Sequence, residues 1–187
     1  MNFDEFNNYL VGISKLEFNE RNHEIQQSVT RLKGEMNSRE ILYSSITLQH
    51  LSDFFGSEFI ARCDFIKNFI VGHVGKLDLT ISNDLATEAK TLFQRLSTSE
   101  KQNIEAMYDG SATQVVGSLL GDHPRQLRDA LQQRIDNCII KNNLYVEMEF
   151  KSVNDAKSSN KEFLILSPSF YGMGINLKEL WNRYFKT

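Results

Sequence analysis

The chain has little cysteine, little proline and no long apolar run. Its two cysteines, Cys63 and Cys138, lie far apart among apolar neighbours, which excludes a disulfide framework and predicts buried free thiols in a reducing compartment. Two prolines and 41% hydrophobic residues predict order nearly throughout the 187 residues. No apolar run approaches the roughly 20 residues that span a bilayer, and the first residues are acidic where a secretory signal is basic. We therefore expect a cytoplasmic protein without membrane contact.

A strong excess of one charge is also absent. The formal net charge is -3, so the molecule as a whole is not attracted to nucleic acid, and any contact with DNA must come from a local patch. The spacings His-x-x-x-His, Cys-x-x-Cys and Gly-x-Ser-x-Gly do not occur in the sequence, which leaves a metal site or a nucleophilic site without support. We expect no cofactor, no metal and no enzymatic activity.

Apolar residues at spacings of three and four dominate the first half of the chain and indicate amphipathic helices. Four helices are predicted, over 3–16, 18–36, 39–55 and 57–68, and Gly56 is predicted to end the third. The first two either pack on the rest of the domain or pair with a second copy of the chain. The alternation of apolar and polar residues over 77–82 predicts a short strand, with 69–71 either its hairpin partner or a continuing helix.

The second half is predicted to contain shorter helices followed by a hairpin. The helices are expected over 83–96, 98–110, 111–120 and 124–141. The second of them starts with the capping box Ser97-x-x-Glu100. The last has Pro124 in its first turn and is stopped by Asn142-Asn143. Residues 144–151 alternate between apolar and polar, which is typical of a strand, and 163–166 would pair with them. A final helix is expected from Asn176.

Two short motifs follow each other in the sequence and are joined by a glycine turn. Val116-Gly117-Ser118-Leu119-Leu120-Gly121 is followed by His123-Pro124-Arg125-Gln126-Leu127-Arg128. With the predicted hairpin after them, these motifs resemble the winged helix-turn-helix superfamily over about residues 98–167. The resemblance implies a mainly α fold with β-hairpins, of the α+β class. Its domains would be a helical region over 1–97, for dimerisation or partner docking, with a possible degenerate winged-helix unit at 39–81, and a winged-helix-like unit with a C-terminal helix over 98–187.

The resemblance also implies a function, namely a non-enzymatic regulator that binds double-stranded DNA. The residues expected to contact DNA are Ser111, Thr113, Arg125, Gln126, Arg128, Lys157 and Lys161. The alternative is a protein–protein adaptor, or an accessory subunit of a larger complex of the tandem winged-helix type, without direct DNA readout. Aromatic residues near the C-terminus, Tyr171, Trp181 and Tyr184, are the candidate anchors for a protein partner or a homodimer.

Overall fold

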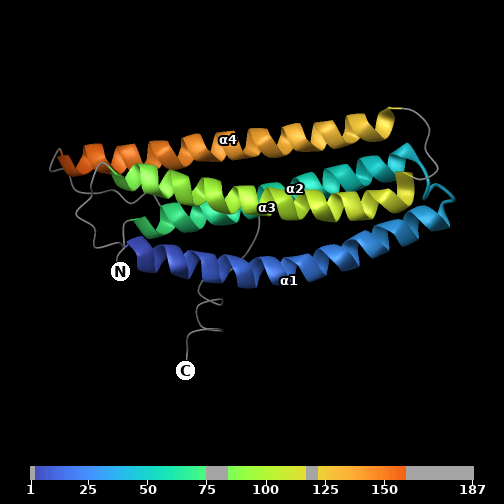
Figure 1. Ribbon diagram of the computed structural model, residues 1–187, viewed down its shortest axis with the longest axis horizontal. Helices are drawn as coiled ribbons and strands as arrows, with labels where there is room; N and C mark the ends of the chain where they lie inside the picture. The colour runs from blue at the N-terminus through green and yellow to red at the C-terminus, as the bar shows by residue number, and fades with distance from the viewer. Residues whose placement is uncertain (1–2, 75–83, 117–121, 159–187) are drawn as a thin grey trace, which may run out of the picture. The chain divides into compact units, whose positions relative to one another are not determined.

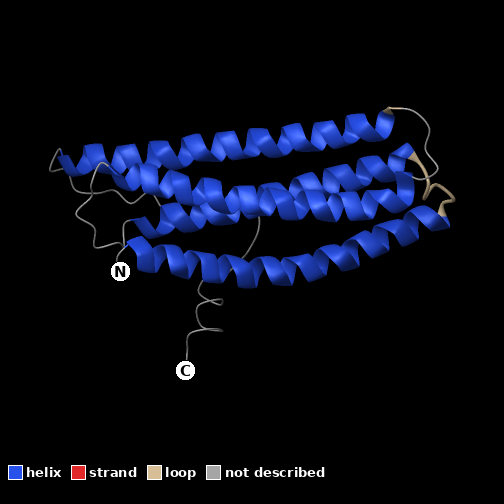
Figure 2. Ribbon diagram, viewed as in Figure 1, coloured by secondary structure: helices blue, strands red, loops and turns tan. Residues whose placement is uncertain are grey.

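The computed structural model describes residues 3–74, 84–116 and 122–158, and every long element within these ranges is an α-helix (Figures 1 and 2). The helices are α1 (Phe3–Ser38), α2 (Ser45–Val74), α3 (Asp84–Val116) and α4 (His123–Ser158). The first three helices and α4 as far as Asp155 belong to one compact unit. The α+β fold class is therefore wrong for the described residues, which contain four helices and no strand.

The four helices form an antiparallel bundle, in which each helix runs opposite to the one before it (Figure 1). α2 and α3 lie side by side in the middle, with α1 on one side of the pair and α4 on the other. Aromatic and aliphatic side chains fill the space between them. The largest fully buried apolar side chains are Phe6, Leu10, Leu48, Leu51, Phe55, Phe59, Ile66, Ile70, Phe93, Ile104 and Leu131.

Most of the apolar stripe predicted for the N-terminal helices is buried within the same chain, whereas Leu16 is 60% exposed. Phe6, Leu10, Phe18 and Ile25 are all part of the core, so of the two alternatives for this stripe the structure shows packing on the rest of the domain. The two predicted helices are a single one, since no glycine or proline separates Leu16 from Phe18.

A left-handed residue ends α1 and a serine begins α2. Glu40 has φ 61°, its N–H donates to the carbonyl oxygen of Asn37 at 3.0 Å, and the N–H of Ile41 donates to that of Met36 at 3.0 Å. These two bonds are the pair that closes a helix C-terminus in the Schellman motif. Four residues later the hydroxyl of Ser44 accepts the backbone N–H of Thr47 at 3.3 Å, the N-cap bond that starts a helix.

Several predicted helix ends are wrong because the helices continue through them. Gly56 lies inside α2, Gly110 lies inside α3, and Ser97-x-x-Glu100 lies in the middle of α3. Asn142-Asn143 likewise lies inside α4. A glycine costs a helix only about 1 kcal/mol, and burial of the neighbouring apolar residues outweighs that cost. In consequence, the predicted boundary after residue 97 falls within α3.

The strand predicted over 144–151 is also wrong, because these residues are helical in α4. An alternating pattern repeats every two residues, so it also contains pairs that are four residues apart, and a helix brings such pairs onto one face. Val146 and Phe150 face the core, whereas Leu144 and Met148 face outward. The apolar alternation is therefore two rows on opposite sides of a helix, and the winged-helix wing does not form here.

Other predictions have mixed outcomes. Pro124 lies in the first turn of α4, as predicted, and 69–71 continues α2 as a helix. The predicted strands over 77–82 and 163–166 and the helix from Asn176 lie outside the described residues.

Candidate interaction site on the outer face of α4

Three large apolar side chains form a row on the outer face of α4. Ile140, Leu144 and Met148 follow each other at intervals of four residues and are 59%, 55% and 69% exposed. Tyr145 lies next to the row and is 43% exposed. We call these four residues the outer row. Single exposed apolar residues are ordinary, but a contiguous apolar patch on a folded domain marks an interaction surface.

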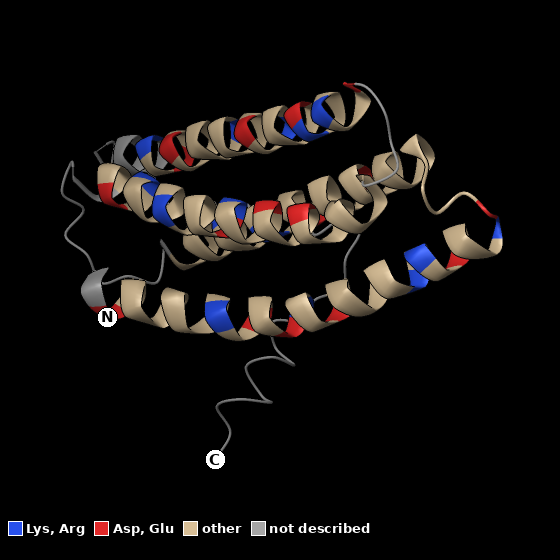
Figure 3. Cartoon of the chain, turned by 45° about the vertical axis from the view of Figure 1, so that its right-hand side comes forward, with Lys and Arg blue, Asp and Glu red and all other residues tan. Residues whose placement is uncertain are grey.

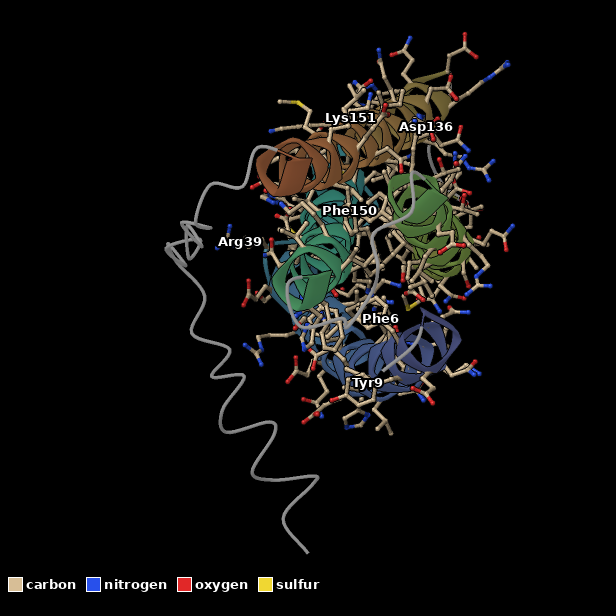
Figure 4. All side chains as sticks on the ribbon, turned by 90° about the vertical axis from the view of Figure 1, so that its left-hand side faces the viewer. Phe6, Tyr9, Arg39, Asp136, Phe150 and Lys151 are labelled. Carbon is tan, nitrogen blue, oxygen red and sulfur yellow. The ribbon has the colours of Figure 1, made fainter. Side chains whose placement is uncertain are left out.

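The opposite face of α4 fixes the helix on the bundle. Leu131, Ile135, Val146 and Phe150 are buried. Figure 4 shows Phe150 between α4 and the helices below it, while Lys151 lies on the outer side. The hydroxyl of Ser52 in α2 also donates to the backbone carbonyl of Leu127 at 3.4 Å. Because α4 already has a complete core face, the outer row is not needed to hold this helix in place.

Charges of both signs run along the helices (Figure 3). Asp136 and Glu147, beside the outer row, form ion pairs. The Nζ atom of Lys101 in α3 lies 2.6 Å from the carboxylate of Asp136. The carboxylate of Glu147 lies 2.7 Å from Lys90 in α3 and 2.6 Å from Lys151. Lys141 has no ion pair among the residues that the structure describes. Asp136 and Glu147 are thus neutralised within the chain and Glu149 is hydrogen-bonded with Tyr145, whereas Lys141 has no acid paired with it in the described part of the chain.

The two ion pairs of Glu147 change its titration. The hydrogen bond from Lys151 and that from Lys90 hold the pKa of Glu147 at about 2, below the ordinary value of 4.5. On the other side of the helix, the ammonium of Lys67 in α2 lies 5.2 Å from the centroid of the Tyr145 ring, within the range of a cation–π contact. The outer row is therefore fixed at both edges by contacts to α3 and α2.

The two cysteines meet beneath α4. Cys63 in α2 is fully buried, Cys138 in α4 packs against the same core, and both are free thiols. A hydrogen bond from the Cys63 thiol to Cys138, together with burial, raises the pKa of Cys63. The same hydrogen bond lowers the pKa of Cys138. The Nδ2 atom of Asn142 also donates to Cys138 Sγ at 3.4 Å. The expectation of free thiols agrees with this arrangement.

A charged network crosses the bundle interior on the far side from the outer row. The guanidinium of Arg62 in α2 is completely buried and donates to Glu58 at 3.0 Å, to Glu100 of α3 and to the side-chain oxygen of Asn22 in α1 at 2.6 Å. Arg21 of α1 binds both carboxylate oxygens of Glu58, at 2.7 and 2.8 Å. Each carboxylate in this network faces an arginine, which makes it a structural connection between three helices.

The network offers no site for a metal ion. No group of three or more metal-ligating side chains occurs within the described ranges. Hydrogen bonds to Glu58 raise the pKa of Arg21 above its ordinary value. The carboxylates of Glu58 and Glu100 are already paired with arginines of the chain. The chemistry of the network is that of a buried ion pair and not of a reaction centre.

Five of the residues expected to contact DNA lie in the last turns of α3 and the first turns of α4. Arg125, Gln126 and Arg128 are exposed on the first turns of α4, and Arg128 pairs with Asp109 of α3 at 2.7 Å. Ser111 and Thr113 lie in α3, where the hydroxyl of Thr113 donates to the backbone carbonyl of Asp109 at 2.6 Å. No wing faces these residues within the described ranges, because the residues assigned to its first strand are helical.

The remaining candidate residues are outside the part of the chain whose side chains are described. The backbone of Lys157 belongs to α4. Lys161, Tyr171, Trp181 and Tyr184 lie outside the described residues.

The sequence interpretation missed the outer row, although its signal is present. The spacing of Ile140, Leu144 and Met148 is one helical turn repeated twice, but it was hidden by the alternating pattern of the same segment. Helical spacing across Asn142-Asn143 is the signal that would have revealed it.

Comparison with known proteins returns no relative. No family model, curated protein or solved structure matches the chain. Among the described residues, no helix combines the length and apolar character that crossing a membrane requires.

Proposed function

We propose that this protein is a non-enzymatic adaptor, which binds an amphipathic helix of a protein partner along the outer row of α4. The observation that carries the proposal is the exposure of Ile140, Leu144 and Met148 on a helix whose core face is already complete. A row of apolar residues at helical spacing is the surface that a partner helix with anchors at i, i+3, i+4 and i+7 recognises.

The charge beside the row indicates the chemistry of the partner. Because Asp136 and Glu147 are neutralised by lysines of this chain while Lys141 is not, the local field favours carboxylates on the incoming helix. Like-charged lysines on that helix would be repelled. The partner helix therefore carries an apolar row with acidic residues beside it.

The size of the row sets the strength of the contact. Ile140 to Met148 spans about 12 Å at 1.5 Å per residue, and burying three half-exposed apolar side chains contributes about 1 kcal/mol each. Association costs at least about 4 kcal/mol in lost freedom. The row thus supports a transient complex, and a tight one needs further contacts beside it.

The compartment belongs to the same proposal. Cys63 and Cys138 pack as free thiols, which is usual in a reducing compartment. The free thiols support our proposal of a cytoplasmic adaptor.

The test uses two synthetic helical peptides with the same row of leucines, one carrying glutamates beside the row and the other carrying lysines. Fluorescence anisotropy of the labelled peptides titrated with the full chain gives both affinities. We expect the acidic peptide to bind at least tenfold more tightly than the basic one at low salt. Equal affinities, or no binding of either peptide, would contradict the proposal.

A matched pair of variants locates the binding. Leu144→Gln removes the centre of the outer row, whereas Leu16→Gln changes a lone exposed leucine of α1 that is 60% exposed. We expect the first variant to lose acidic-peptide binding and the second to keep it. The outer row could instead be covered by a second copy of this chain, and sedimentation of the protein alone tests that alternative. A dimer that Leu144→Gln dissociates would show that a second copy, and not a partner helix, covers the row.

A further inference from the structure

A second candidate site lies on the opposite side of the molecule, in a groove between α1 and α3. The groove has a volume of about 440 Å³, which falls within the range of small-molecule sites. Its apolar walls come from Val11 and Phe18 of α1 and Leu96 of α3. None of these residues belongs to the outer row or to its neighbours, so the groove is separate from the proposed adaptor surface.

A buried hydroxyl in this groove has no partner. Ser14 lines the groove, is 3% exposed, and its Oγ atom makes no hydrogen bond. A serine in a helix ordinarily donates to the carbonyl four residues earlier, and a buried polar group without a partner is costly. The Ser14 hydroxyl is therefore an unsatisfied polar group sealed beneath the wall of the groove.

Two cations at the groove lack a neutralising acid. Lys15 has no ion pair among the described residues, and Arg95 donates only to the neutral side-chain oxygen of Asn7, at 2.6 Å. The one acid that lines the groove, Glu100, is held by Arg62 from inside the bundle. The groove thus has a positive field in a chain whose net charge is -3.

We propose that this groove binds a small amphipathic anion, in which a carboxylate meets Lys15 and Arg95 and a compact apolar body packs on Val11 and Leu96. The guanidinium of Arg95 matches a carboxylate through two parallel hydrogen bonds.

The test compares 1-naphthylacetate with its neutral amide, 1-naphthylacetamide, by calorimetric titration of the full chain. The two probes share their aromatic body and differ in charge, so the amide measures apolar binding alone. We expect the carboxylate to bind about tenfold more tightly than the amide, because hydrogen bonds to charged groups are the stronger ones. Equal affinities of the two probes would overturn the proposal.

Variants assign the binding to the groove. The double variant Lys15→Gln with Arg95→Gln changes two exposed side chains, and we expect it to weaken carboxylate binding about tenfold while amide binding stays unchanged. Lys141→Gln, the matched loss of a lysine on α4, leaves both affinities unchanged. Carboxylate affinity that persists in the double variant would place the anion elsewhere and refute the assignment.

Discussion

At the scale of single residues, Arg62 makes the most unusual contacts in the molecule. A fully buried guanidinium is rare, and this one joins Glu58 of its own helix to Glu100 of α3 and to Asn22 of α1. The aromatic ring of Phe18 covers it, with the guanidinium carbon 5.1 Å from the ring centroid. Such a network adds little net stability compared with apolar residues of the same shape, but breaking it leaves a buried charge unpaired.

Arg62→Met is therefore expected to lower the free energy of unfolding by about 3 to 5 kcal/mol. Urea denaturation followed by circular dichroism measures the change. Arg125→Met, at an exposed position of α4, is the control and stays within about 0.5 kcal/mol of the parent. Adding Glu100→Gln to Arg62→Met restores part of the loss, since the unpaired charge is removed. An unchanged stability of Arg62→Met would show that the network is not formed.

Glu147 gives a prediction about pH at the same scale. Its pKa is about 2 in the folded chain against an ordinary value of 4.5, so its ion pairs stabilise the folded state above pH 4.5. That contribution is lost as the pH falls from 4.5 toward 2. We expect a carboxyl resonance of Glu147 that titrates near pH 2, and a return toward 4.5 in Lys90→Gln with Lys151→Gln. A midpoint near 4.5 in the parent protein would mean that the α3–α4 pair does not form in solution.

At the scale of elements, the sequence predicted most helical segments but not their lengths. Spacings of three and four identified the apolar faces of α1, and the start of α4 at Pro124 followed from its missing N–H. Helix ends were placed at Gly56, Gly110 and Asn142, where the local signal was a break. Packing against neighbouring helices overrides such weak local preferences, and that packing is not visible in a single segment.

The glycines within the helices test this explanation. A Cβ atom on Gly110 meets nothing within 4 Å, whereas one on Gly56 lies 2.9 Å from the Arg134 side chain. We expect Gly110→Ala to raise the free energy of unfolding by about 0.5 to 1 kcal/mol, because alanine is the better helix former. Gly56→Ala gains less, since Arg134 must move and its 3.2 Å hydrogen bond to Ser57 is disturbed. Thermal unfolding of both variants measures the difference, and a loss of stability in Gly110→Ala would indicate a helix end there.

At the scale of the whole molecule, the topology was beyond the reach of sequence patterns. The segment 144–151 fits both a strand and a helix, and only the burial of Val146 and Phe150 against α2 and α3 decides between them. The candidate site depends on that decision, because as a strand the segment would have been a wing, and as a helix it presents the outer row. The polar network that connects α1, α2 and α3 was likewise invisible, since its members lie far apart in the sequence.

The antiparallel bundle also gives the two proposed sites different positions. The outer row lies on α4 and the anion groove lies between α1 and α3, with α2 and α3 forming the centre of the bundle (Figures 1 and 4). Occupation of one site is therefore expected to leave the residues of the other unperturbed.

The measurement that tests the account most directly is the mapping of NMR shifts of the full chain as the acidic amphipathic peptide is added. The account predicts that the methyl resonances of Ile140, Leu144 and Met148 change most, together with the amide of Lys141. The methyl resonances of Val11 and Leu96 in the groove are predicted to stay in place. Shifts centred on α1 or α3, with the outer row unaffected, would contradict the assignment of α4 as the docking surface.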